Sequence, residues 1–179
     1  MCNRFAFACA LVLLAGLAPD EIRKGMPPVP GKQRPDADLP TRLTLSIGGG
    51  IFPPNYGVVL DGKSLTYRVQ TYDYAASKAA ETSKTITPTP EQWRGFWKSM
   101  DEVGLWDWRP RYDDSRIFDG TFWSVEADHA GRSVRSQGRQ LFPGQETIPG
   151  PGEIRRDRGP LFEKYLAAVE KLLGGEPFR

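Results

Sequence analysis

Four of the chain's five tryptophans lie within one short stretch, WRGFWKSMDEVGLWDW, which spans residues 93–108. Fully burying one large side chain contributes on the order of 3 kcal/mol, whereas a whole domain is stable by only about 5–15 kcal/mol. Exposing all four indole rings to water would therefore forfeit most of the stability of an ordinary domain. The stretch constrains the chain to fold around a core that contains at least some of these rings.

The first half of this stretch has the period of a helix that packs on a sheet. On a helical wheel of about 100° per residue, four large apolar side chains fall on one stripe; they are Trp93, Phe96, Trp97 and Met100. Thr89 is a favourable N-cap, Pro90 suits the first helical position, Gln92 has the capping-box spacing and Gly104 is a typical stop. We expect a helix here, with Trp93 and Trp97 in the core.

The second half of the stretch is the candidate binding surface. Two of its rings are two residues apart in a segment expected to be extended, so they should face the same way. Arginines and a tyrosine follow closely, and aromatics beside arginine are typical of surfaces that bind sugars, peptides or anionic groups. The alternative is that both rings cap the edge of the core, which the proximity of Gly104 favours. The candidate ligand-binding residues are Trp106, Trp108, Arg109, Arg111 and Tyr112.

The N-terminal residues predict export. Residues 5–18 are an apolar run that follows Arg4, and this run has the length of a signal peptide but is short for a bilayer span. We predict that residues 1–18 are a signal peptide and that the protein is periplasmic or secreted. An uncleaved segment is the alternative, and it would be the route of any membrane contact. Cys2 and Cys9 both fall inside this segment, so the mature domain would have no disulfide and no thiol nucleophile.

The rest of the chain divides into a linker and one domain. Residues 19–40 are proline-rich and indicate a flexible linker, and residues 41–175 form the domain. RLTLSIGGG alternates apolar and polar residues like a half-buried strand. Asp61-Gly62 and Ala130-Gly131 mark two hairpins, whereas residues 75–90 read as a polar connection and residues 105–120 as irregular or extended. A terminal helix carries an apolar stripe and ends at Gly174; the stripe consists of Leu161, Tyr165, Val169 and Leu172.

This order of elements, β-β-β-α-β-β-α, predicts an α+β fold. Its simplest form is an antiparallel sheet of about five strands with two helices packed on one face. A chain of 179 residues has the length of one domain plus a tail, so a single domain is expected.

The C-terminal half contains DGTFW at residues 119–123, SQGRQLFP at residues 136–143 and a terminal helix with an apolar stripe. In these motifs it resembles small, uncharacterised bacterial exported proteins. In that family a D-G-T-x-W strand leads to a return strand, an S-x-G-x-x-x-F-P turn and a terminal amphipathic helix. The chain differs by a long insert between Pro143 and Leu161, and the resemblance covers about the last 90 residues. The family implies no known activity, so no functional residue is carried over. The matching residues are Asp119, Gly120, Thr121, Trp123, Ser136, Gly138, Phe142 and Pro143.

No motif for catalysis or metal binding stands out. The single histidine, His129, is placed at an exposed hairpin tip, where a general base would lack an orienting partner. Asp113, Asp114 and Asp119 do not have the spacing of a calcium loop. A net charge of +2 is too close to neutral for a nucleic-acid-binding protein. We therefore expect no catalytic residue, no metal and no cofactor.

Three functions remain open from the sequence. The first is an exported, non-enzymatic binding or structural domain of the cell envelope, whose partner is an envelope polymer, a peptide or a protein. The second is a hydrolase that uses carboxylates alone, such as Asp107 and Glu126. The third is a protease-inhibitor-like loop at residues 144–159, which carries Arg155, Arg156 and Arg158.

Overall fold

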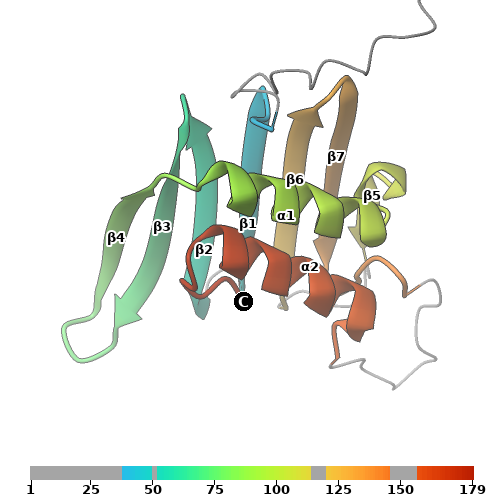
Figure 1. Ribbon diagram of the computed structural model, residues 1–179. Coiled ribbons are helices and arrows are strands. Elements are labelled where there is room, and N and C mark those ends of the chain that lie inside the picture. The colour runs from blue at the N-terminus through green and yellow to red at the C-terminus, as the bar shows by residue number, and fades with distance from the viewer. Residues whose placement is uncertain (1–37, 50–51, 114–119, 146–156) are drawn as a thin grey trace, which may run out of the picture. The chain divides into compact units, whose positions relative to one another are not determined.

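The computed structural model describes residues 38–49, 52–113, 120–145 and 157–179, all within one compact unit. This unit contains a seven-stranded sheet in the order β4-β3-β2-β1-β6-β7-β5. Two helices lie on the same side of the sheet (Figure 1). The elements are β1 (Arg42–Gly49), β2 (Phe52–Asp61), β3 (Ser64–Asp73), β4 (Lys78–Ile86), α1 (Pro90–Glu102), the short 3₁₀ helix η1 (Leu105–Asp107), β5 (Arg111–Asp113), β6 (Phe122–His129), β7 (Arg132–Arg139) and α2 (Gly159–Leu172).

The α+β class is confirmed, but the strand count and the pairing need correction. The sheet has seven strands instead of about five, and β5 pairs with β7 in parallel. The first missed strand is β4, which the sequence presents as a polar connection because almost every one of its side chains is exposed. The second is β5, which has three residues and no room for a repeating pattern.

Both hairpins form where the turn residues predict them. Gly62 has a φ of 61°, which its lack of a Cβ allows, and it joins β2 to β3. Ala130 and Gly131 both have positive φ, as a type I′ turn requires, and they join β6 to β7. The central strand β1 pairs antiparallel with β2 on one side and with β6 on the other.

The predicted end signals of α1 are also confirmed. The Thr89 side chain accepts a hydrogen bond from the Gln92 backbone N–H, and the Gln92 side chain accepts one from the Thr89 N–H. Gly104 follows the helix with a φ of 64°. Trp93, Phe96, Trp97 and Met100 are all buried, so this face of α1 packs against the sheet.

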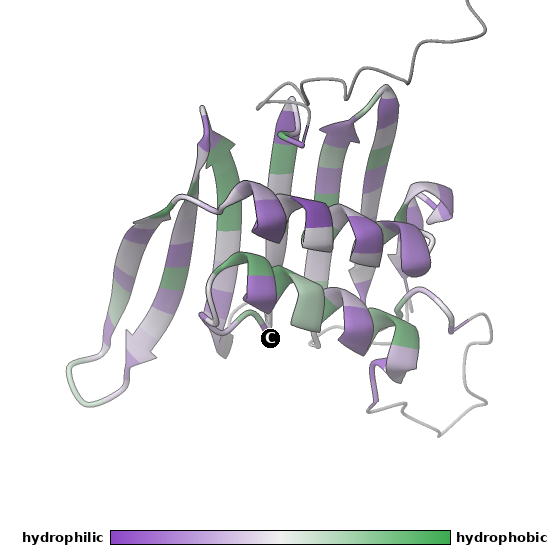
Figure 2. Ribbon diagram, in the orientation of Figure 1, coloured by the Kyte–Doolittle hydropathy of each residue, from purple (hydrophilic) through white to green (hydrophobic). Residues whose placement is uncertain are grey.

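The core lies between the helices and the sheet. Hydrophilic and hydrophobic bands alternate along the strands, as expected where one face is buried (Figure 2). Trp123 of β6 crosses this core, and its Nε1 donates to the Leu141 carbonyl at 2.9 Å. A Cβ on Gly138 would lie 2.3 Å from that Nε1, so the glycine makes room for the ring. Trp108 and Phe162 pack around it, with ring centroids 5.7 and 5.0 Å away.

Candidate binding surface

The two candidate tryptophans do not form one exposed surface. The 3₁₀ turn η1 replaces the expected extended segment, so the two rings point in different directions. Trp108 is 8% exposed and its Nε1 donates to the Val103 carbonyl. Trp106 is half-buried, donates to the Asp101 carboxylate at 2.8 Å, and has the Arg132 guanidinium 4.4 Å from its ring centroid. Packing therefore accounts for Trp108 entirely and for much of Trp106.

The other three candidates lie around β5. The Tyr112 ring is buried against Trp123, and its hydroxyl accepts a hydrogen bond from the Arg109 backbone N–H at 3.1 Å. The Arg109 guanidinium lies 4.6 Å from the Tyr112 ring centroid. Arg111 is exposed and faces away from this packing. Of the five predicted residues, Trp108 and Tyr112 are thus in the core, Trp106 is half-buried, and Arg109 and Arg111 are exposed. Arg111 belongs to a different surface from the aromatic residues.

The expectation that His129 is exposed is wrong. Its imidazole stacks on Trp97, with ring centroids 4.1 Å apart and planes 4° apart, and 9% of the residue is exposed. Burial lowers the pKa of His129, and this effect outweighs a backbone hydrogen bond with Leu39 that acts in the opposite direction. The histidine at the hairpin end is thus part of the aromatic core.

The face of the sheet opposite the helices, called the open face below, carries most of the polar strand residues. Because neighbouring strands are in register, one row of directly paired residues crosses all seven strands. At the β4 edge the row ends at Ser83, which pairs with Arg68. The stretch of the row from β3 to β5 begins and ends with an arginine, and the positions between them are small or polar. In order from β3 to β5, the row is Arg68, Gly57, Ser46, Ser124, Gln137 and Arg111.

The open face is hollowed along this row. One hollow of about 310 Å³ lies over β1, β6, β7 and β5, and another of about 360 Å³ lies over β1, β2, β3 and β4. Both are lined by Ser46 and Phe122, so they adjoin and are called the trough below. Phe122 is 39% exposed in the middle of this surface.

Small side chains form the floor of the trough. The hydroxyls of Ser46 and Ser124 lie 2.7 Å apart and hydrogen-bond to each other. A Cβ built on Gly57 would meet no atom within 4 Å, so the space above this glycine is open. The depth of the trough therefore follows from short side chains at the centre of the sheet and longer ones toward its edges.

The charges of the trough lie at its two ends. At the β5 end, Asp113 pairs with Arg139 at 2.8 Å and more loosely with Arg111 at 3.6 Å, so two guanidinium groups share one carboxylate. At the other end, the Gln70 amide donates to Glu81 at 3.0 Å. Arg68 has no hydrogen-bond or ion-pair partner among the residues that the structure describes. Each end thus has an exposed guanidinium group, without a partner in the described residues for Arg68 and with a 3.6 Å contact to Asp113 for Arg111.

The carboxylates beside the trough are held by arginines. Arg135 contacts Glu126 at 3.4 Å and Asp128 at 3.0 Å, and Arg42 approaches the same two side chains. Hydrogen bonding from Arg135 keeps the pKa of Asp128 below its usual range. Within the described ranges, no group of three or more acidic, histidine or cysteine side chains is arranged to hold a metal ion.

The sequence contains part of the signal for this surface. Ser46, Ser124 and Arg68 occupy the polar positions of alternating strands, which predicts that they point away from the core. Their position in one row depends on the pairing of β1 with β6, strands that are separated by 78 residues at the Ser46–Ser124 contact. Such long-range pairing has no local sequence signature.

Two predicted features lie partly outside the described residues. Asp114 and Asp119 fall in the gap at residues 114–119, and most of the 144–159 loop falls in the gap at 146–156.

In the described part of the chain, no helix has the length and apolar character needed to cross a membrane. No family model matches the chain, and comparison with curated proteins and with solved structures likewise gives no match.

Proposed function

We propose that the protein is a non-enzymatic binding domain of the cell envelope and that it holds an extended polar polymer in the trough of its open face. The observation that supports this proposal most directly is the row that runs from Arg68 to Arg111 across the sheet. Five strand spacings of about 4.8 Å separate its ends, which gives a site about 24 Å long. A site of this length suits a polymer better than a small metabolite.

The contacts around the trough support binding more than catalysis. A general acid needs a pKa raised toward neutrality, whereas hydrogen bonding from Arg135 lowers the pKa of Asp128. Glu126 is paired with Arg135 at 3.4 Å and with Arg42 at 3.7 Å. The carboxylate-only hydrolase is therefore the weaker hypothesis. Export to the periplasm or the exterior, predicted from residues 1–18, would place the trough among envelope polymers.

A tyrosine at position 57 tests the proposal. Because Gly57 has open space above it and its backbone lies outside the left-handed region, Gly57→Tyr fills the part of the trough over β2, next to Arg68, without a clash. Tyrosine also has a high strand propensity. The matched control is Gly95→Tyr on α1, where a Cβ likewise meets no atom within 4 Å.

The measurement is calorimetric titration of the full chain and both variants with neutral and acidic hexasaccharides. We expect the wild type and Gly95→Tyr to bind at least one of them, and Gly57→Tyr to bind at least tenfold more weakly with an unchanged circular dichroism spectrum. Equal affinity of Gly57→Tyr and the wild type would show that the ligand does not occupy the trough.

A further inference from the structure

We infer that the trough selects an acidic polysaccharide, with ring carboxylates of the uronate type bound by the arginines at its ends. This inference rests on the proposed function and adds the chemical class of the ligand. Three properties of the open face support it: its backbone N–H and C=O groups are already paired between strands, its floor carries hydroxyl and amide groups, and its arginines lie at the two ends of the trough.

The backbone argues for a polysaccharide over a peptide. In the interior of a sheet the N–H and C=O groups are already used by the neighbouring strands. An extended peptide gains most of its affinity by pairing with such groups at a free edge, and gains specificity from apolar pockets. The open face over β1 and β6 offers no free edge, because each of these strands has a partner on both sides. A ligand there must bind to side chains.

The side chains of the trough are those that match a polyol. Hydroxyls from Ser46 and Ser124 and the amide of Gln137 can each donate and accept hydrogen bonds, as sugar hydroxyls do. Phe122 presents a partly exposed ring between the two hollows. The negative face of an aromatic ring attracts the weakly positive C–H edge of a sugar ring. The floor and the ring together provide both kinds of contact along one line.

The charges at the two ends select an acid. A guanidinium group binds a carboxylate through two parallel hydrogen bonds, which gives both strength and orientation. Arg68 has no competing partner in the described part of the chain, and Arg111 shares Asp113 with Arg139. Both arginines lie in the same row as the hydroxyl floor. A polymer with carboxylates along its length can engage both ends while its sugar rings cover the centre.

The test compares two ligands that differ only at their carboxyl groups. Oligogalacturonate hexasaccharide and its fully methyl-esterified form have the same sugar backbone, but only the first has free carboxylates. We expect the full chain to bind the acid at least tenfold more tightly than the ester. Arg68→Gln and Arg111→Gln should each weaken binding of the acid roughly tenfold and reduce its dependence on salt. Arg42→Gln, on the same face but outside the trough, is the matched control.

Each outcome separates this inference from the proposed function. If acid and ester bind equally and Gly57→Tyr abolishes both, the trough is a binding site but the selection for acids is wrong. If a polyglutamate peptide binds in the trough and neither saccharide does, the polysaccharide class is wrong. If the acid binds and neither Gly57→Tyr nor the two glutamine variants weaken it, or if none of the three probes binds, both proposals are overturned.

Discussion

At the scale of single residues, His129 combines a titratable group with a stacked position in the core. Burial against Trp97 keeps its pKa in the folded chain below the ordinary value of 6.5. Arg132 nearby acts in the same direction, whereas Asp38 and Asp101 oppose it. Between the lowered pKa and 6.5 the unfolded chain binds more protons than the folded chain, so stability rises with pH there. Below this window both states are protonated, and above it both are neutral.

We therefore predict that the urea midpoint of the wild type falls as the pH drops below about 6.5, with little change between pH 7.5 and 8.5. Because His129 is the single histidine of the chain, the variant His129→Phe should lose this dependence while keeping a ring against Trp97. The check is a series of urea denaturation curves at pH 8.5, 7.5, 6.5 and 5.5. A slope between pH 7.5 and 5.5 that is identical in both proteins would contradict the assignment.

At the scale of elements, α1 depends on its capping box. The Thr89 hydroxyl accepts from the Gln92 N–H at 3.2 Å, and the Gln92 side chain accepts from the Thr89 N–H at 2.8 Å. Losing an N-cap side chain typically costs about 1 kcal/mol. We predict that Thr89→Ala lowers the free energy of unfolding by about this amount, as measured by urea denaturation. Thr89→Ser, which keeps the hydroxyl, should stay close to the wild type, and equal losses in both variants would argue against the cap.

Some of the helices and strands have local sequence signals and could be predicted, whereas others could not. Thr89, Gly104 and Gly62 mark ends and turns with short-range chemistry, so α1 and both hairpins form as expected. β4 could not be predicted, because an exposed edge strand keeps no apolar alternation and its pairing with β3 alone defines it. Of the residues in the proposed trough, the sequence singled out Arg111 but not Arg68, for a related reason. Aromatic residues suggest a surface from sequence, but Trp108 and Tyr112 are buried. Arg68 joins the row only through the pairing of β3 with β2.

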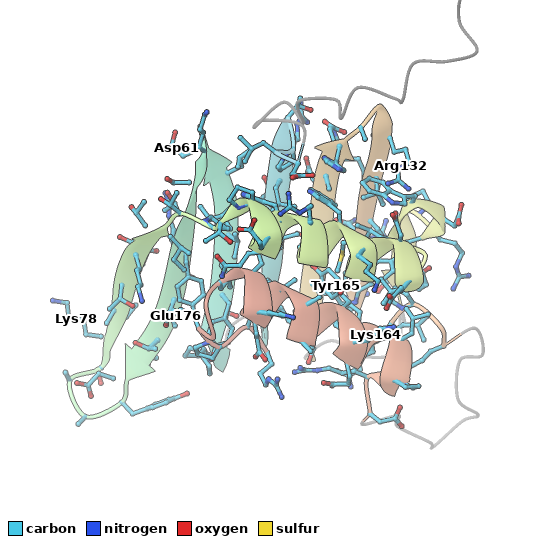
Figure 3. All side chains as sticks on the ribbon, in the orientation of Figure 1. Asp61, Lys78, Arg132, Lys164, Tyr165 and Glu176 are labelled. Atoms are coloured by element: carbon cyan, nitrogen blue, oxygen red, sulfur yellow. The ribbon has the colours of Figure 1, made fainter. Side chains whose placement is uncertain are left out.

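At the scale of the whole molecule, contacts between distant elements close the core. Lys164 of α2 forms an ion pair with Glu102 of α1, so a polar contact joins the two helices. Lys164 is labelled on α2 in Figure 3. The β3–β4 hairpin reaches beyond the helices, with Lys78 at its far end (Figure 3). Residues 176–179 return to the sheet, where the Tyr67 hydroxyl donates to the Pro177 carbonyl at 2.6 Å. Burial raises the pKa of this tyrosine to about 12, so it stays protonated as a donor.

Phe178 is the residue through which this returning segment completes the core. It is 0% exposed and lies 6.3 Å from the Tyr56 ring, and Glu170 accepts hydrogen bonds from its backbone N–H and from the Arg179 side chain. Truncating a buried phenylalanine costs about 3–5 kcal/mol, since both transfer free energy and packing are lost. We predict that Phe178→Ala lowers the free energy of unfolding by about this amount in urea denaturation.

Two further variants separate the buried ring from the exposed charge next to it. Phe178→Leu keeps most of the apolar volume and should lose clearly less stability than Phe178→Ala. Arg179→Ala should change the urea midpoint little, because exposed ion pairs contribute little to stability. If Phe178→Ala unfolded at the wild-type urea concentration, the segment would be a surface attachment and the core would close without it. If Phe178→Ala loses much stability while Phe178→Leu and Arg179→Ala lose little, the sheet and α2 depend on the Phe178 ring, which is distant from both β2 and β3 in the sequence.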